Sequence, residues 1–182
     1  MTPVSESPEE LARDAALRQL EIMDPEEKQR FARITRLAKR LFDVDIACIA
    51  LIDADHEWFV SCEGAEWTGA RREHSFCAET VVSGVPLIVP DAQADERFRD
   101  NPQVAGPPHI RFYAGHPIVT PSGTCVGAMS IRGPEARELS DDDLDLLADL
   151  AHMVEDEVRV GRVRHLEREV SDRLAAQQQA EK

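Results

Sequence analysis

The stretch Asn101–Ile131, NPQVAGPPHIRFYAGHPIVTPSGTCVGAMSI, decides the predicted fold. Its apolar runs at about 109–119 and 124–131 are rich in β-branched and aromatic residues, which predicts two strands. Pro121-Ser122-Gly123 lies between them and predicts a turn, so the two strands should pair as an antiparallel hairpin. The preceding Gly106-Pro107-Pro108 is a stiff loop, because each proline fixes its own φ and restricts its predecessor. A stiff loop that leads into a hairpin is a suitable wall for a pocket.

The rest of the sequence predicts helices around a second hairpin. Apolar residues at three- and four-residue spacing predict helices over 8–23, which Ser7 can cap, and over 25–42, which should pack on a sheet. The β-branched segments 44–52 and 57–62 predict a central hairpin. We expect a loop at 64–72, a short helix at 75–83, a strand at 86–89, a helical turn at 95–98 and a stiff loop at 101–108.

The C-terminal part predicts a long helix. Ser140 can cap its start, and the three aspartates that follow suit the positive end of the helix dipole. The apolar face continues after Gly161 with spacing close to that of a coiled-coil seam. The residues of this continuation are Val163, Leu166, Val170 and Leu174.

Together with Ser75-Phe76-Cys77-Ala78 and the segment 86–92 (PLIVPDA), the opening stretch resembles the GAF family of sensory domains over about 25–158. The resemblance and the order of elements both predict a GAF/PAS-like α+β fold. It has a central antiparallel sheet of about five or six strands, helices on its faces, and N- and C-terminal helices packed together. The expected organisation is an N-terminal helix at 1–24, the GAF-like domain at 25–158 and a signalling or linker helix at 159–182.

Composition excludes several classes of partner. The formal net charge of −14 argues against nucleic acid and against anionic membrane surfaces, since both are bound through Lys and Arg. No apolar run reaches the ~20 residues that span a bilayer. The first residues lack the features of a signal peptide. We therefore expect a cytoplasmic protein without membrane insertion.

The four cysteines indicate no structural metal site, and no cofactor is assigned to the sequence. Cys48, Cys62, Cys77 and Cys125 form no CxxC pair and no Cys/His cluster with zinc spacing. In the cytoplasm they should be reduced. Burial in apolar strands should raise the pKa of Cys48 and Cys125.

The resemblance implies a ligand between one face of the sheet and the loops and short helices that cross it. Aromatic walls with a few polar anchors suit a small organic ligand, whose identity the sequence does not give. The candidate ligand-binding residues, carried over by motif, are His74, Phe76, Cys77, Asp91, Arg97, Phe98, His109, Arg111 and Tyr113. No catalytic residue and no metal ligand is assigned.

Several of these side chains have two interpretations. Arg111 either clamps an anionic ligand group or pairs with Asp91 or Asp95, and the pair is favoured because isolated buried charges are costly. Of the two tryptophans, Trp58 is expected in the core, and Trp67 either covers the pocket or packs on the surface.

Cys77 is the residue with the sharpest chemical alternatives. Near the start of a helix and three residues after His74, its pKa should be lowered toward the thiolate. The opposing interpretation is a small buried apolar residue, which is the commoner role of a free cysteine. Thiol chemistry would make the chain similar to the free methionine sulfoxide reductases, with Cys62 and Cys125 as exchange partners.

A haem or bilin sensor is a further alternative. Ala78-Glu79-Thr80 follows Cys77, whereas bilin-binding relatives usually have a histidine there. His109 and His116 are candidate axial haem ligands. Seven residues apart on a regular strand, they face opposite sides of the sheet and cannot share one metal.

The sequence therefore predicts a sensory or regulatory GAF-type module and not an enzyme. We expect a homodimer formed through the N- and C-terminal helices. Ligand binding would change the position of those helices and pass the signal to an output domain or protein, such as a histidine kinase, a GGDEF cyclase or a phosphatase. The thiol-dependent reductase and the haem or bilin sensor are the rival hypotheses.

Overall fold

The computed structural model describes residues 7–20 and 25–180, and these residues form a six-stranded sheet flanked by helices. All neighbouring strands run antiparallel, in the order β3-β2-β1-β6-β5-β4. The predicted α+β fold is confirmed. The strands are β1 (Ile46–Ile52), β2 (His56–Glu63), β3 (Gly69–Arg71), β4 (Leu87–Val89), β5 (Phe112–Val119) and β6 (Cys125–Gly133).

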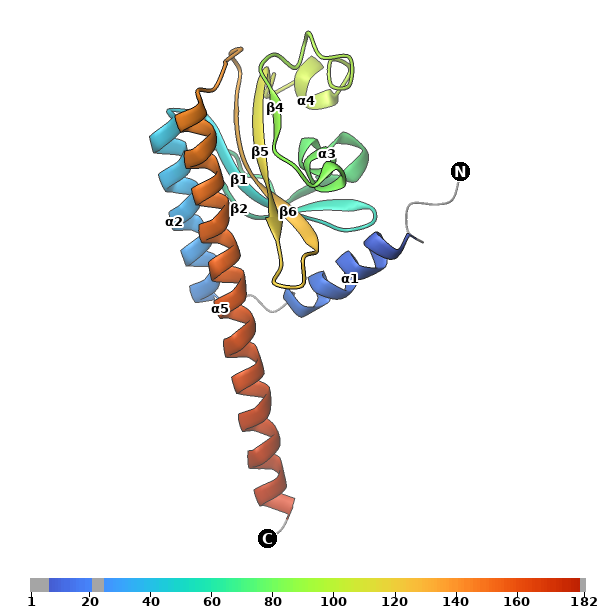
Figure 1. Cartoon of the computed structure of the whole chain (residues 1–182), viewed down its shortest axis with the longest axis vertical. Coiled ribbons are helices and arrows are strands. Elements are labelled where there is room, and N and C mark those ends of the chain that lie inside the picture. The colour runs from blue at the N-terminus through green and yellow to red at the C-terminus, as the bar shows by residue number, and fades with distance from the viewer. Residues whose placement is uncertain (1–6, 21–24, 181–182) are drawn as a thin grey trace.

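The helices cover the sheet unequally (Figure 1). Helices α2 (Pro25–Phe42) and α5 (Asp141–Ala180) lie side by side on one face. The short η2 (Arg72–His74), α3 (Phe76–Ser83) and α4 (Pro102–Ala105) lie on the other side. Helix α1 (Pro8–Leu20) crosses the end of the sheet where the β5–β6 hairpin turns. The helix that runs along α5 is therefore α2, and α1 packs against α5 less extensively than α2 does.

Each face of the sheet has a core, because successive side chains of a strand point to opposite sides. Ala47 and Ile49 pack in the cluster that includes α2 and α5. Ala50 and Ile52 pack with Phe76 in the cluster under α3. A β-bulge between Ile49 and Ala50 changes the register of β1 against β2 at this point.

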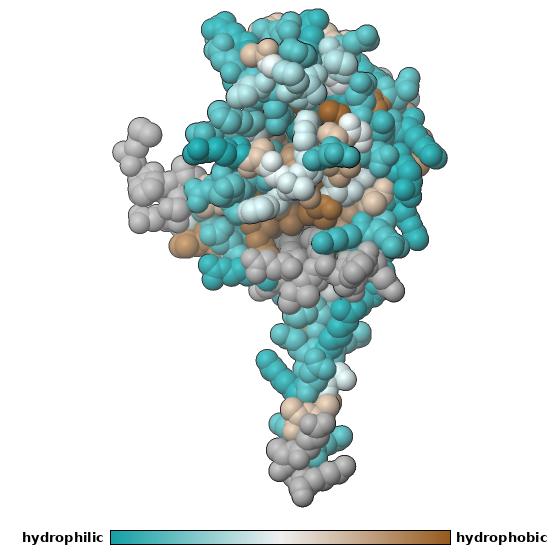
Figure 2. Space-filling model, turned by 180° about the vertical axis from the view of Figure 1, so that it is seen from behind, coloured by the Kyte–Doolittle hydropathy of each residue, from teal (hydrophilic) through white to brown (hydrophobic). Residues whose placement is uncertain are grey.

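Helix α5 starts as predicted and extends far beyond the domain. The Ser140 hydroxyl accepts a hydrogen bond from the backbone N–H of Asp143, whose carboxylate accepts one from the N–H of Ser140. The helix passes Gly161 without a break. Figure 2 shows its second half standing clear of the globular part. Val163, Leu166, Val170 and Leu174 on this half are 50–55% exposed.

Some local predictions are wrong. The loop expected at 64–72 contains the edge strand β3, and the stiff loop contains α4 and a cis Pro107–Pro108 bond. β5 begins only at Phe112, so His109, with φ of 59°, lies outside it. Trp58 is 51% exposed instead of lying in the core, and its indole N–H donates to Asp53. The last residues of the helix predicted over 8–23 lie outside the described residues.

Candidate functional site

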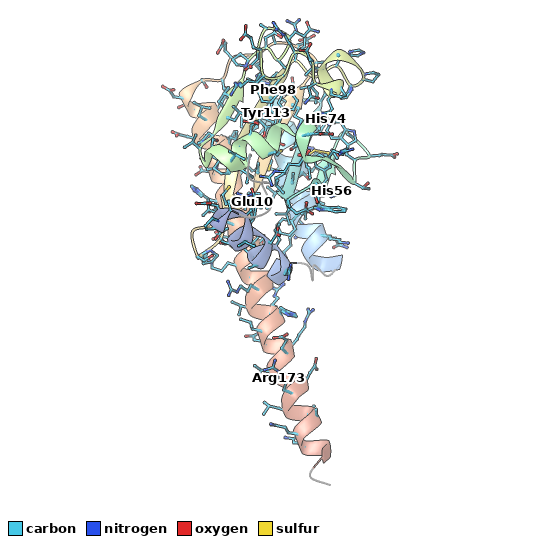
Figure 3. The ribbon with its side chains drawn as sticks, turned by 90° about the vertical axis from the view of Figure 1, so that its right-hand side faces the viewer. Glu10, His56, His74, Phe98, Tyr113 and Arg173 are labelled. Carbon is cyan, nitrogen blue, oxygen red and sulfur yellow. A yellow bond between two sulfur atoms is a disulfide. The ribbon has the colours of Figure 1, made fainter. Side chains whose placement is uncertain are left out.

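Four of the predicted ligand-binding residues meet between α3 and the sheet. Ser75 caps α3 by accepting a hydrogen bond from the N–H of Ala78, which places Phe76 and Cys77 in the first turn with no exposed surface. The ring of Phe76 stacks between two others, with centroid distances of 4.3 Å to Phe98 and 5.0 Å to Tyr113. Figure 3 shows Phe98 and Tyr113 beside each other at α3. That Phe76, Cys77, Phe98 and Tyr113 bind a ligand stays a prediction.

The same cluster contains a buried ion pair that the sequence did not reveal. Arg132 on β6 and Glu57 on β2 are both 0% exposed, and Arg132 Nη2 lies 3.4 Å from Glu57 Oε1. Arg132 Nη2 also donates to Cys77 Sγ at 3.1 Å and to Ser130 Oγ at 3.4 Å, and Nη1 donates to Gln103 Oε1 at 3.4 Å. Arg132 Nε and Glu57 Oε2 have no hydrogen-bond partner among the described residues. The site thus has one spare donor and one spare acceptor.

Aromatic rings enclose the Arg132 guanidinium. Its Cζ lies 5.6 Å from the ring centroid of Phe59, 5.4 Å from that of Trp67 and 5.4 Å from that of Tyr113. These are cation–π distances, so the negative faces of the rings compensate part of the desolvation of the charge. Trp67, which the sequence left between two interpretations, covers this cluster from the β2–β3 loop.

The environment of Cys77 favours the neutral thiol. Burial, followed by the negative charge of Glu57, raises the pKa of Cys77 to about 12, and the nearby Arg132 only partly opposes this. The predicted lowering by the helix start is therefore wrong, because desolvation outweighs the dipole. Burial also raises the pKa of Tyr113 well above its usual value of 10. The Tyr113 hydroxyl donates to Cys77 Sγ at 3.5 Å and shares a 3.0 Å hydrogen bond with Thr80.

Two further predicted residues lie at the rim of an open groove. The groove has a volume of about 730 Å³ and runs past η2 and α3. His74 lies on it with a side chain 45% exposed, and its carbonyl accepts a hydrogen bond from Asn101 Nδ2. Arg97 pairs with Asp95 at 2.6 Å and lies 5.0 Å over the ring of Phe98. Phe98 lines the groove and also packs in the buried cluster, so it joins the two.

The remaining predicted residues lie apart from the cluster. Arg111 Nε donates to Asp91 Oδ1 at 3.0 Å, and Arg111 Nη2 contacts Asp91 Oδ2. This ion pair confirms the structural interpretation of Arg111, and its hydrogen bonds hold the pKa of Asp91 below the usual value. His109 is exposed.

The cysteines differ from the expectation that all four are reduced. Cys48 on β1 and Cys62 on β2 are register partners and form a disulfide. Cys77 and Cys125 are free, and burial raises the pKa of Cys125 as predicted. The described residues contain no group of three or more His, Cys, Asp or Glu that could hold a metal ion.

Comparison with known proteins agrees with this architecture. The model of the GAF domain family matches residues 26–158. The chain belongs to the GAF domain family. A cyclic di-GMP phosphodiesterase of Pseudomonas aeruginosa is 35% identical to this GAF chain over 147 residues, 80% of the chain and 25% of that protein. The chain therefore spans a quarter of the length of that relative.

Solved structures share the GAF fold. The GAF domain of a phosphoenolpyruvate-protein phosphotransferase from Coxiella burnetii superposes with a TM-score of 0.66 at 13% identity, covering 88% of this chain and 99% of that one. A free methionine-R-sulfoxide reductase from Neisseria meningitidis superposes with a TM-score of 0.64 at 18% identity, covering 88% and 96%. At such identities the likeness concerns the fold alone. Within residues 7–20 and 25–180, none of the helices combines the length and the apolar character that a bilayer-spanning segment needs.

Proposed function

We propose that this chain is a cytoplasmic sensory module that binds a small molecule and relays the event through α5 to an output domain. The observation that carries the proposal is the continuity of α5. Its first half packs in the core with Leu147, Leu150 and Val154, and its second half projects into solvent. A displacement in the domain is therefore transmitted along one rigid element. Since the Pseudomonas aeruginosa relative is a cyclic di-GMP phosphodiesterase, cyclic di-nucleotide signalling is the output class that we propose.

The proposed ligand site comprises the groove and the buried cluster, and Phe98 belongs to both. Opening at the groove, which has His74 and Arg97 at its rim, would give a ligand access to the cluster. Beneath α3, Arg132 Nε offers a donor and Glu57 Oε2 an acceptor, and both lack partners among the described residues. A small organic molecule with a neighbouring acceptor and donor would satisfy both atoms. Because unpaired buried polar atoms are costly, such a ligand would gain from pairing them.

The relay runs from the sheet to α5 and on to a second copy of the chain. Glu155 Oε1 on α5 accepts a hydrogen bond from the N–H of Val119 at 2.8 Å, at the irregular end of β5. This contact lies close to the point where the helix leaves the domain. The exposed seam of α5 beyond it would be buried if two copies paired side by side. A ligand shifts the helices only by its difference in affinity between their two arrangements.

We propose that the module is not an enzyme. The buried Cys77 thiol, with its pKa of about 12, supports this, because exchange chemistry needs a thiolate. Reduction of free methionine sulfoxide by the chain, abolished by Cys77→Ser, would establish the reductase alternative instead. A visible absorption band in the purified protein would favour the haem or bilin sensor.

Native mass spectrometry of freshly purified protein tests the proposal. We expect a dimer that carries a small molecule. Val170→Glu in the seam should give monomers. Val85→Glu, at the 57% exposed Val85 that follows α3, is the matched control and should leave the dimer intact. A monomeric wild-type chain, or a Val170→Glu variant that still pairs, would refute the relay. Dimers without any retained or titratable small molecule would refute sensing.

A further inference from the structure

Charged side chains hold α1 against the domain. Glu10 and Arg13 are each only 5% exposed, whereas Leu11 between them is 59% exposed. Ala16 and Leu17 reach the core only in part. Burying charges is tolerable only when their partners are in place. The position of α1 therefore depends on the groups that Glu10 and Arg13 contact.

One carboxylate joins three segments of the chain. Glu10 Oε1 accepts hydrogen bonds from Arg13 Nη1 at 2.5 Å and from Arg72 Nη2 at 2.6 Å, and Oε2 accepts one from Arg72 Nη1 at 2.9 Å. Arg13 Nε donates to the carbonyl of Cys125 on β6, and Arg72 Nη1 to the carbonyl of Asp53 in the β1–β2 turn. Figure 3 shows Glu10 on α1 below α3.

Arg72 also belongs to the candidate ligand site. It is the first residue of η2, which leads directly to the α3 cap Ser75 and to the buried Phe76. It lines the groove together with His74. A movement of Arg72 therefore changes the lining of the groove and, at the same time, the hydrogen bonds to the Glu10 carboxylate.

We propose that α1 is a releasable strap, docked by Glu10, that is coupled through Arg72 to the segment carrying the ligand site. A ligand that draws Arg72 into the groove leaves the Glu10 carboxylate buried with one partner fewer, and α1 is released. By reciprocity, undocking α1 frees Arg72 and changes ligand affinity by the same factor. The regulatory consequence rests on the proposed ligand site, but the docking and its coupling to η2–α3 do not require a ligand.

Amide hydrogen exchange on the whole chain without ligand tests the strap. Three proteins are compared: wild type, Glu10→Ala and Glu9→Ala, where Glu9 is an exposed residue of the same first turn. Both variants gain the same helix propensity, so only the docking differs. In Glu10→Ala we expect at least tenfold faster exchange over 8–20 and a measurable acceleration over 72–83, with β5 and β6 unchanged. Glu9→Ala should match wild type.

Each other outcome overturns the proposal. Unchanged exchange of α1 in Glu10→Ala would show that the carboxylate does not hold the helix. Faster exchange of α1 alone would show that it is not coupled to η2 and α3. Acceleration that includes β5 and β6 would make Glu10 a part of the core and not a latch. Failure to find a ligand by mass spectrometry would refute sensing but leave these results intact.

Discussion

Removing either Arg132 or Glu57 alone should destabilise the protein strongly, whereas replacing both by apolar residues should change its stability little. At 3.4 Å and an effective dielectric constant of about 20, the two charges attract with a gross energy of about 5 kcal/mol. Removing one partner leaves the other charge fully buried without its counterion. We expect Glu57→Leu and Arg132→Met each to lower the free energy of unfolding by about 3–5 kcal/mol.

The double variant distinguishes pairing from packing. With both charges gone, the apolar side chains fill a similar volume and no desolvation cost remains, so Glu57→Leu/Arg132→Met should lie within about 1–2 kcal/mol of wild type. The coupling energy of the cycle is then at least about 3 kcal/mol. Glu66→Leu on the exposed loop is the control and should change stability by less than about 0.5 kcal/mol.

Urea denaturation of all five proteins measures these values, provided that each transition is two-state. A domain of this kind is stable by only about 5–15 kcal/mol, so a loss of about 3–5 kcal/mol can leave too little folded protein to measure. The isosteric Glu57→Gln, which should cost about 1–3 kcal/mol, keeps the cycle measurable. Single variants that each cost less than about 1 kcal/mol, with additive effects, would refute the burial of this pair.

Three further predictions concern titration and capping. Cys77 should stay unlabelled by a thiol reagent at pH 8 in the native protein while Cys125 reacts. Burial raises the pKa of Cys77 from its usual 9.0 to about 12, so its contribution to stability is complete below about pH 9 and is lost as pH rises toward 12. Burial alone would raise the pKa of Glu10, but its two arginine partners lower it below 4.5, so α1 should lose exchange protection only as pH falls below that value. Ser140→Ala should cost about 1 kcal/mol in thermal or urea unfolding, whereas Ser171→Ala, exposed within α5, should cost nothing.

The sequence predicted the sheet well because hydrophobic periodicity and turn chemistry are local signals. It also placed Phe76 and Tyr113 in one cluster through the family resemblance. Alternation shows which residues share a face of a strand, but not whether another element covers that part of the face. Trp58 has the alternation of a core residue, yet its end of β2 borders an open groove of about 790 Å³. Its exposure could not be predicted for that reason.

The disulfide depends on a β-bulge that could not be predicted from the sequence. Near the turn, β1 and β2 pair Ile52 with Glu57 and Ala50 with Phe59. Continued regularly, this register would set Cys62 opposite Ala47. The bulge after Ile49 shifts the register by one residue and sets Cys62 opposite Cys48 instead. A hairpin prediction without the bulge therefore separates two cysteines that the structure joins.

Neither composition nor a sequence motif singled out Arg132 as a candidate functional residue. An arginine at the end of a strand is usually exposed, since its charge is costly to bury. Strand alternation nevertheless puts it on the face of Ala128 and Ser130, whose small side chains leave room above the sheet, and that is the signal that could have revealed it. Buried ion pairs contribute little net stability compared with apolar replacements. We therefore propose that Arg132 and Glu57 serve to bind a ligand or to hold α3. A double variant that folds normally but binds no small molecule, where the wild type binds one, would separate that role from stability.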